Sequence, residues 1–86
     1  MRLNPEPFER IKSGLKKNEV RLNDEKRKKI SAGDTIIFSK RPELSEKIRV
    51  RVLGRKEVKS FPNMDKFYPK EEQDKYGFVI FDIEVL

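Results

Sequence analysis

The chain has 86 residues, enough for one domain with a modest hydrophobic core, and its 42% of charged residues implies an extensive solvated surface. It contains no cysteine and no histidine, which excludes disulfides, thiolate metal sites and the commonest general base, and we expect neither a metal nor a cofactor. No apolar run approaches the ~18 residues of a membrane span, and the N-terminus lacks the apolar stretch of a signal peptide, so we expect a cytoplasmic protein.

The net charge of +6 is concentrated in two segments. Residues 10–29 contain nine basic and three acidic residues, residues 47–59 contain six and one, and the rest of the chain sums to −5. A basic surface of this kind suits a polyanionic partner, because each neutralised phosphate releases counterions. A lysine-rich surface that only confers solubility is the alternative interpretation.

The first predicted element is a helix over residues 5–13. Asn4 precedes a proline, which is the typical order of an N-cap and a first helical residue. Phe8, Ile11 and Leu15 follow at helical spacing, and the glycine after residue 13 can end the helix in the left-handed conformation.

Alternating apolar and polar residues predict four strands, at residues 18–22, 35–39, 48–52 and 77–86. Residues 1–3 add a fifth strand if they pair with the sheet, and the last strand should lie centrally in it. Together with the helix, these strands predict a single α+β domain, predominantly β, with a small closed sheet.

Three other features are less regular. Asn23 and Asp24 can cap a helical turn over residues 26–29, which would carry a cluster of basic side chains. Gly54 interrupts the third strand and indicates a bulge or a bend there. Residues 60–76 lack any periodicity, and they are the part of the chain that the sequence specifies least.

The segment from Gly14 to the end of the second element carries the most chemistry. Strand alternation places Glu19 and Arg21 on one face, about 7 Å apart at a rise of about 3.3 Å per residue, opposite Val20. Lys16 lies in the preceding turn, next to a glycine that allows a ligand to approach the backbone. On spacing alone, Gly14 is equally explained as a helix cap, and Glu19 with Arg21 as an exposed ion pair.

These residues spell Gly-x-Lys-x-x-Glu-x-Arg, which resembles the signature of the ASCH (activating signal cointegrator homology) domain. The resemblance covers nearly the whole chain, including the Pro-Glu-x-Phe-x-x-Ile-x-x-Gly helix, Gly-Asp-x-Ile-x-Phe at residues 33–38 and the Tyr-Gly before the last strand. It implies a small β-barrel related to PUA domains, with the N-terminal helix packed beside it and a charged cleft between the two. It also implies RNA binding, which has been proposed for the family as a whole.

Our first hypothesis is a binding module for RNA or a nucleotide, in which Glu19 accepts from a base amino group and the cations contact phosphate or a base edge. The candidate binding residues are Gly14, Lys16, Glu19, Arg21, Lys26, Arg27, Lys28, Lys29, Arg49 and Arg51. A base would also need an aromatic side chain for stacking. The candidates are Phe8, which fits the core better, and Phe61, Phe67, Tyr68 and Tyr76.

The alternative is an enzyme that uses Lys16, Glu19 and Arg21, either an amidohydrolase of a modified nucleoside or a ribonuclease with Glu19 as general base. Some relatives hydrolyse 4-acetylcytidine with the motif lysine, a threonine at the position of Glu19 and a glutamate from a later helical segment. Here Glu19 replaces the hydroxyl and favours the charged form of Lys16, and neither Glu71 nor Glu72 matches the later glutamate by motif. A third reading is a protein-interaction module with a basic face for acidic partners.

Overall fold

The computed structural model describes all 86 residues and contains one five-stranded sheet. The strands are β1 (Arg2–Leu3), β2 (Asn18–Leu22), β3 (Thr35–Lys40), β4 (Lys47–Val58) and β5 (Phe78–Val85), in the order β1-β3-β4-β5-β2. Only β1 and β3 are parallel; the other neighbours are antiparallel. The predicted α+β, mostly-strand fold is confirmed, and the possible fifth strand is present.

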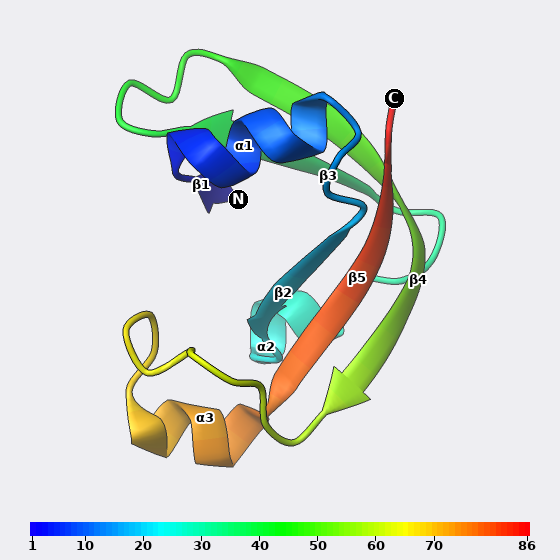
Figure 1. The fold of residues 1–86 in the computed structure, drawn as a ribbon. Helices are drawn as coiled ribbons and strands as arrows, with labels where there is room; N and C mark the ends of the chain where they lie inside the picture. The colour runs from blue at the N-terminus through cyan, green and yellow to red at the C-terminus, as the bar shows by residue number, and fades with distance from the viewer.

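The sheet curls into a half-barrel, and its two edge strands are β1 and β2 (Figure 1). No backbone hydrogen bond joins these two edges, so the closed sheet that the sequence predicts does not form, because the two residues of β1 pair only with β3. The sheet stays open along a line that we call the seam. The main core fills the inner face of the curl against helix α1 (Pro5–Lys12). It consists of Leu3, Phe8, Ile11, Ile36, Phe38, Ile48, Val50, Val52, Val79, Phe81 and Ile83.

Helix α1 begins where the sequence predicts and ends one residue earlier, at Lys12, with Ser13 as its C-cap. Asn4 occupies the N-cap position, although its side chain makes no capping bond and only its carbonyl accepts, from the amide of Phe8 at 3.1 Å. Gly14 follows the helix with φ of +83°, the left-handed conformation that glycine adopts at low cost. The helical spacing predicts that Leu15 continues the apolar stripe, but Leu15 is 82% exposed because the chain leaves the helix at Gly14.

A second, smaller cluster covers the outer face of β2 and the start of β5. Leu22, Met64 and Phe78 are buried there, with Val20 half-buried beside them. The irregular segment before β5 supplies the cover, and it includes helix α3 (Lys70–Tyr76), which lacks an apolar stripe and was not predicted. The inner face of β2 therefore belongs to its charged residues, since Val20 and Leu22 point the other way.

Two remaining features position the site. The predicted irregularity at Gly54 is a register shift between Val52 and Gly54, where the β4–β5 pairing slips. Helix α2 (Glu25–Lys28) is a single turn, and its N-cap Asp24 accepts from the amide of Arg27 at 3.1 Å. None of the helices is long and apolar enough to cross a membrane.

Candidate functional site

Glu19 is a buried carboxylate on the inner face of β2. It lies opposite Phe81 in the β2–β5 register and is 5% exposed, which rules out the exposed ion pair that spacing alone allowed. Its Oε1 accepts from Lys16 Nζ at 2.9 Å, and its Oε2 accepts from Arg21 Nε at 2.9 Å. A buried carboxylate needs such partners, because an uncompensated charge away from water is costly.

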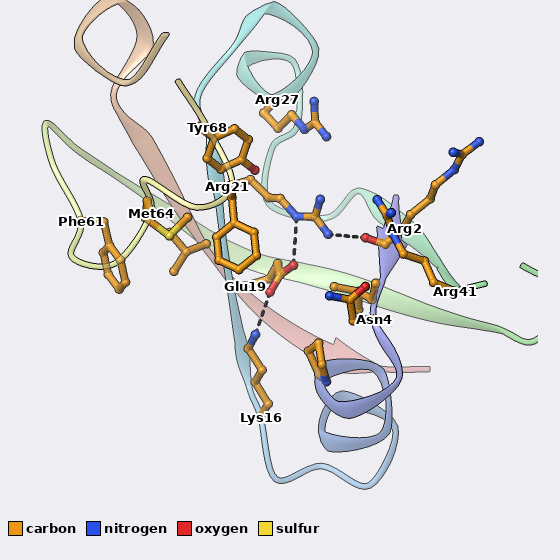
Figure 2. Close-up of a pocket in the computed structure, with 14 residues that line it drawn as sticks. Arg2, Asn4, Lys16, Glu19, Arg21, Arg27, Arg41, Phe61, Met64 and Tyr68 are labelled. Atoms are coloured by element: carbon orange, nitrogen blue, oxygen red, sulfur yellow. Dashed lines mark hydrogen bonds and ion pairs between the residues drawn. The ribbon is translucent and has the colours of Figure 1, made fainter. Parts of the chain in front are cut away.

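Arg21 bridges the seam of the half-barrel. Its Nε holds Glu19, and its Nη2 donates to the carbonyl oxygen of Arg2 at 2.9 Å, so one side chain links β2 to β1. Figure 2 shows the chain of contacts from Lys16 through Glu19 and Arg21 to Arg2. The charged motif thus spans the gap in the sheet's backbone pairing.

A cleft of about 560 Å³ opens along this gap, and we call it the seam cleft. The side chains of Phe61, Met64 and Tyr68 lie on one side of the motif carboxylate, and Arg2 and Arg41 lie on the other (Figure 2). The full lining is Arg2, Leu3, Asn4, Pro7, Lys16, Glu19, Val20, Arg21, Arg27, Arg41, Phe61, Met64, Phe67 and Tyr68.

The lining of the seam cleft is strongly basic. It has five basic side chains and a single carboxylate, that of Glu19, which leaves a net formal charge of +4. Arg2 and Arg41 are exposed, and neither guanidinium takes part in an ion pair or a hydrogen bond within the protein. Their donors are therefore free for a ligand that carries negative charge.

The basic residues predicted from sequence are divided among three surfaces. Lys16 and Arg21 line the seam cleft, and from the helical turn only Arg27 does so, while Lys26, Lys28 and Lys29 do not. The remaining two, Arg49 and Arg51, lie on the outer face of the sheet, because they alternate with buried residues of β4. Gly14 also lies outside the cleft and serves the turn after α1.

The aromatic candidates are divided too. Phe61, Phe67 and Tyr68 line the seam cleft. Phe8 is fully buried in the main core, as expected from its place on the helix stripe, and Tyr76 packs at the edge of the smaller cluster.

Sequence reasoning missed Arg2 and Arg41, although the cleft depends on both. They come together because β1 pairs with the end of β3, and the amide of Arg41 donates to the carbonyl of Leu3 at 2.8 Å. This contact joins residues far apart in the chain, so no local pattern encodes it. The only available signal was the option that residues 1–3 form a strand.

The lining offers little for acid–base catalysis. Glu19 is the only carboxylate in the seam cleft, and each of its oxygens already accepts from a cation. Glu71 and Glu72 are exposed on α3 and do not line the cleft. No later glutamate therefore stands beside Lys16 in the place that the hydrolase alternative requires.

Comparison with known proteins places this geometry in a family. The family model of the ASCH domain matches residues 1–86. The crystal structure of the hypothetical protein PH0355 is similar over 100% of this chain and 96% of its own, with 35% identity and a TM-score of 0.86. The solution NMR structure of protein PF0455 from Pyrococcus furiosus is similar over 100% of this chain and 98% of its own, with 30% identity and a TM-score of 0.66. No functionally curated protein matches the chain. The chain belongs to the ASCH-domain family.

Proposed function

We propose that this protein binds RNA, or a nucleotide, in the seam cleft. The observation that carries the proposal is the lining itself: five basic side chains surround one concave space whose other wall holds aromatic side chains. Its volume of about 560 Å³ falls within the range of about 300–1,000 Å³ that is typical of small-ligand pockets. RNA binding is also the activity generally proposed for the family to which the chain belongs.

The two walls suggest how a nucleotide would lie. Arg2 and Arg41 have free guanidinium groups, which suit a phosphate. Tyr68 and Phe61 are half-buried on the opposite wall and would stack against a base. Unpaired nucleotides are favoured over a duplex, because a base can enter a cleft of this size only when it is unstacked from its neighbours.

Glu19 has a different part in this arrangement from the one first suggested by the sequence. A carboxylate with both oxygens bonded to protein cations is better suited to holding those cations than to accepting from a base. We therefore assign Glu19 to positioning Lys16 and Arg21. The two cations keep further donors for a ligand oxygen, since each has N–H groups beyond those used inside the protein.

The test is an amide-shift titration with cytidine monophosphate and with a single-stranded oligocytidine RNA, repeated between about 50 and 200 mM salt. Perturbed amides should map to the seam cleft. Arg2→Ala with Arg41→Ala should weaken RNA binding and lower the salt slope by about 0.7 for each lost phosphate contact.

The matched control is Arg49→Ala with Arg51→Ala, which removes the same charge from the outer face of the sheet. This variant should retain most of the affinity. Equal losses in the two double variants would mean that binding follows net charge and not the cleft, and the proposal would be abandoned. Salt-independent binding, or no binding to either ligand, would also overturn it.

A further inference from the structure

Arg55 lies on the inner face of the sheet although its position in the sequence predicts the outer one. Arg49 and Arg51 point outward at odd-numbered positions of β4, and Arg55 would follow them in a regular strand. The register shift between Val52 and Gly54 reverses the alternation, so Arg55 pairs with Phe81 and lies over its ring at 5.7 Å. The bulge thus turns one arginine of this strand inward.

The guanidinium of Arg55 contacts both ends of helix α2. Its Nη1 donates to three carbonyls at the C-terminal end, those of Arg27 at 2.9 Å, Lys28 at 3.3 Å and Ile30 at 2.6 Å. Its Nη2 donates to Oδ1 of Asn23 at 2.8 Å, just before the N-cap. Asn23 is buried, so one side chain fixes the segment on either side of the helical turn.

Helix α2 has few other anchors: Lys28 Nζ lies 5.9 Å from the centre of the Tyr76 ring, and Ile30, just after the turn, packs against the main core. It is a single turn with no buried residue, and a helix this short has no stability of its own. Arg27, in the middle of this turn, is the residue of the basic cluster that lines the seam cleft. Its Nη1 is bound to Asp24 at 2.9 Å, while its Nη2 makes no hydrogen bond within the protein.

We infer that Arg55 is a positioning residue for the seam cleft: it holds α2 so that Arg27 presents its free Nη2 to a phosphate of the bound strand. The inference rests on the proposed function. In this arrangement Arg55 itself does not contact the ligand. Arg27 does, whereas its neighbours Lys26, Lys28 and Lys29 do not line the cleft and have no part in the inference.

The experiment measures the affinity of a fluorescein-labelled single-stranded octacytidine RNA for the full chain and four variants, at several salt concentrations. The variants are Arg27→Ala, Arg55→Lys, the combination of both, and Arg51→Lys as a control from the outer face of the same strand. Arg55→Lys keeps the net charge but cannot reproduce the forked contacts of a guanidinium. All variants are compared at a temperature at which circular dichroism shows them folded.

We expect Arg27→Ala and Arg55→Lys each to weaken binding about fivefold, and the combination to be no weaker than Arg27→Ala alone. Arg55→Lys should also lower the salt slope by about 0.7, although its charge is unchanged, because one phosphate contact is lost. A change in stability alone would leave that slope as it is. The control Arg51→Lys should match the unmodified chain.

Two results would overturn the inference: unchanged affinity and salt slope in Arg55→Lys, or an undiminished effect of Arg55→Lys when Arg27 is already alanine. If Arg55→Lys does not fold, Asn23→Ala replaces it, since it removes the acceptor at the other end of α2, and the same coupling with Arg27 is expected. A full chain that fails to bind the RNA would refute the proposed function itself. Loss of binding in Arg27→Ala but not in the positioning variants would refute only the role of Arg55.

Discussion

Glu19→Gln tests whether the charged motif anchors the fold. The substitution keeps the shape of the side chain and removes the charge that binds Lys16 and Arg21, each at 2.9 Å. Breaking a fully buried ion pair costs about 3–5 kcal/mol, because the remaining charge is left without a partner. Here the side chains of Arg21 and Lys16 are 14% and 31% exposed, so water can reach both cations through the cleft.

The expected loss is therefore about 2–3 kcal/mol, near the upper range for hydrogen bonds to charged groups. A domain of 86 residues has a free energy of unfolding of roughly 4–13 kcal/mol, so this is a large fraction of it. In thermal unfolding, the loss corresponds to a fall in Tm of about 10–20 °C.

Urea unfolding followed by circular dichroism measures this loss at neutral pH. The control is Glu84→Gln, which changes an exposed glutamate of β5 that forms no ion pair and should stay within about 0.5 kcal/mol of the unmodified chain. If both variants unfold at the same urea concentration, then Glu19 does not anchor Lys16 and Arg21.

Further predictions concern glycines and a surface ion cluster. Gly77→Ala should cost about 3 kcal/mol in urea unfolding, because Gly77 has φ 66° and ψ −161° and a Cβ would lie 2.9 Å from a carbonyl oxygen of β4. Gly14→Ala should cost only about 1 kcal/mol, since φ is +83° but the space is open; equal losses would contradict the argument. The hydrogen bond from Lys12, with further attraction from Lys40, lowers the pKa of Glu46 below its ordinary 4.5. The ion pairs of Glu46 therefore stabilise the folded chain above pH 4.5, and this stabilisation is lost as the pH falls through the folded pKa. The urea-unfolding midpoints of the unmodified chain and of Glu46→Gln should therefore converge in acid.

Much of the fold could be predicted because it depends on local patterns. Ile36 and Phe38 stand two residues apart between Thr35 and Ser39, a spacing that identifies β3, and the glycine after the first helix ends it in the predicted conformation. Helix α3 could not be found in this way, because Gln73 is its only buried residue. Its position depends on Gln73 Nε2, which donates to Asp65 Oδ1 and to the carbonyl of Tyr68, each at 2.9 Å.

The residue types of the site could be predicted from the sequence, but the burial of its charged residues could not. Strand alternation correctly separates Glu19 and Arg21 from Val20, but it does not say which face of β2 meets the main core. Because the irregular segment covers the outer face, both faces are protected, and the charged face turns inward. The arginines that complete the cleft, Arg2 and Arg41, arrive through the pairing of β1 with β3, which no spacing within the sequence reveals.

The open seam explains why charge is concentrated at this point of the fold. Unpaired edge strands are prone to pair with other chains, and inward-pointing charged side chains are a common defence against it. Arg21 provides that defence on β2 and also makes the bond to β1 at Arg2, so the edges are held together without closing the sheet. A backbone ladder across the seam would remove both the hazard and the cleft. Because a side chain bridges the gap instead, the strands stay apart, and the space between them keeps basic groups that a phosphate can reach.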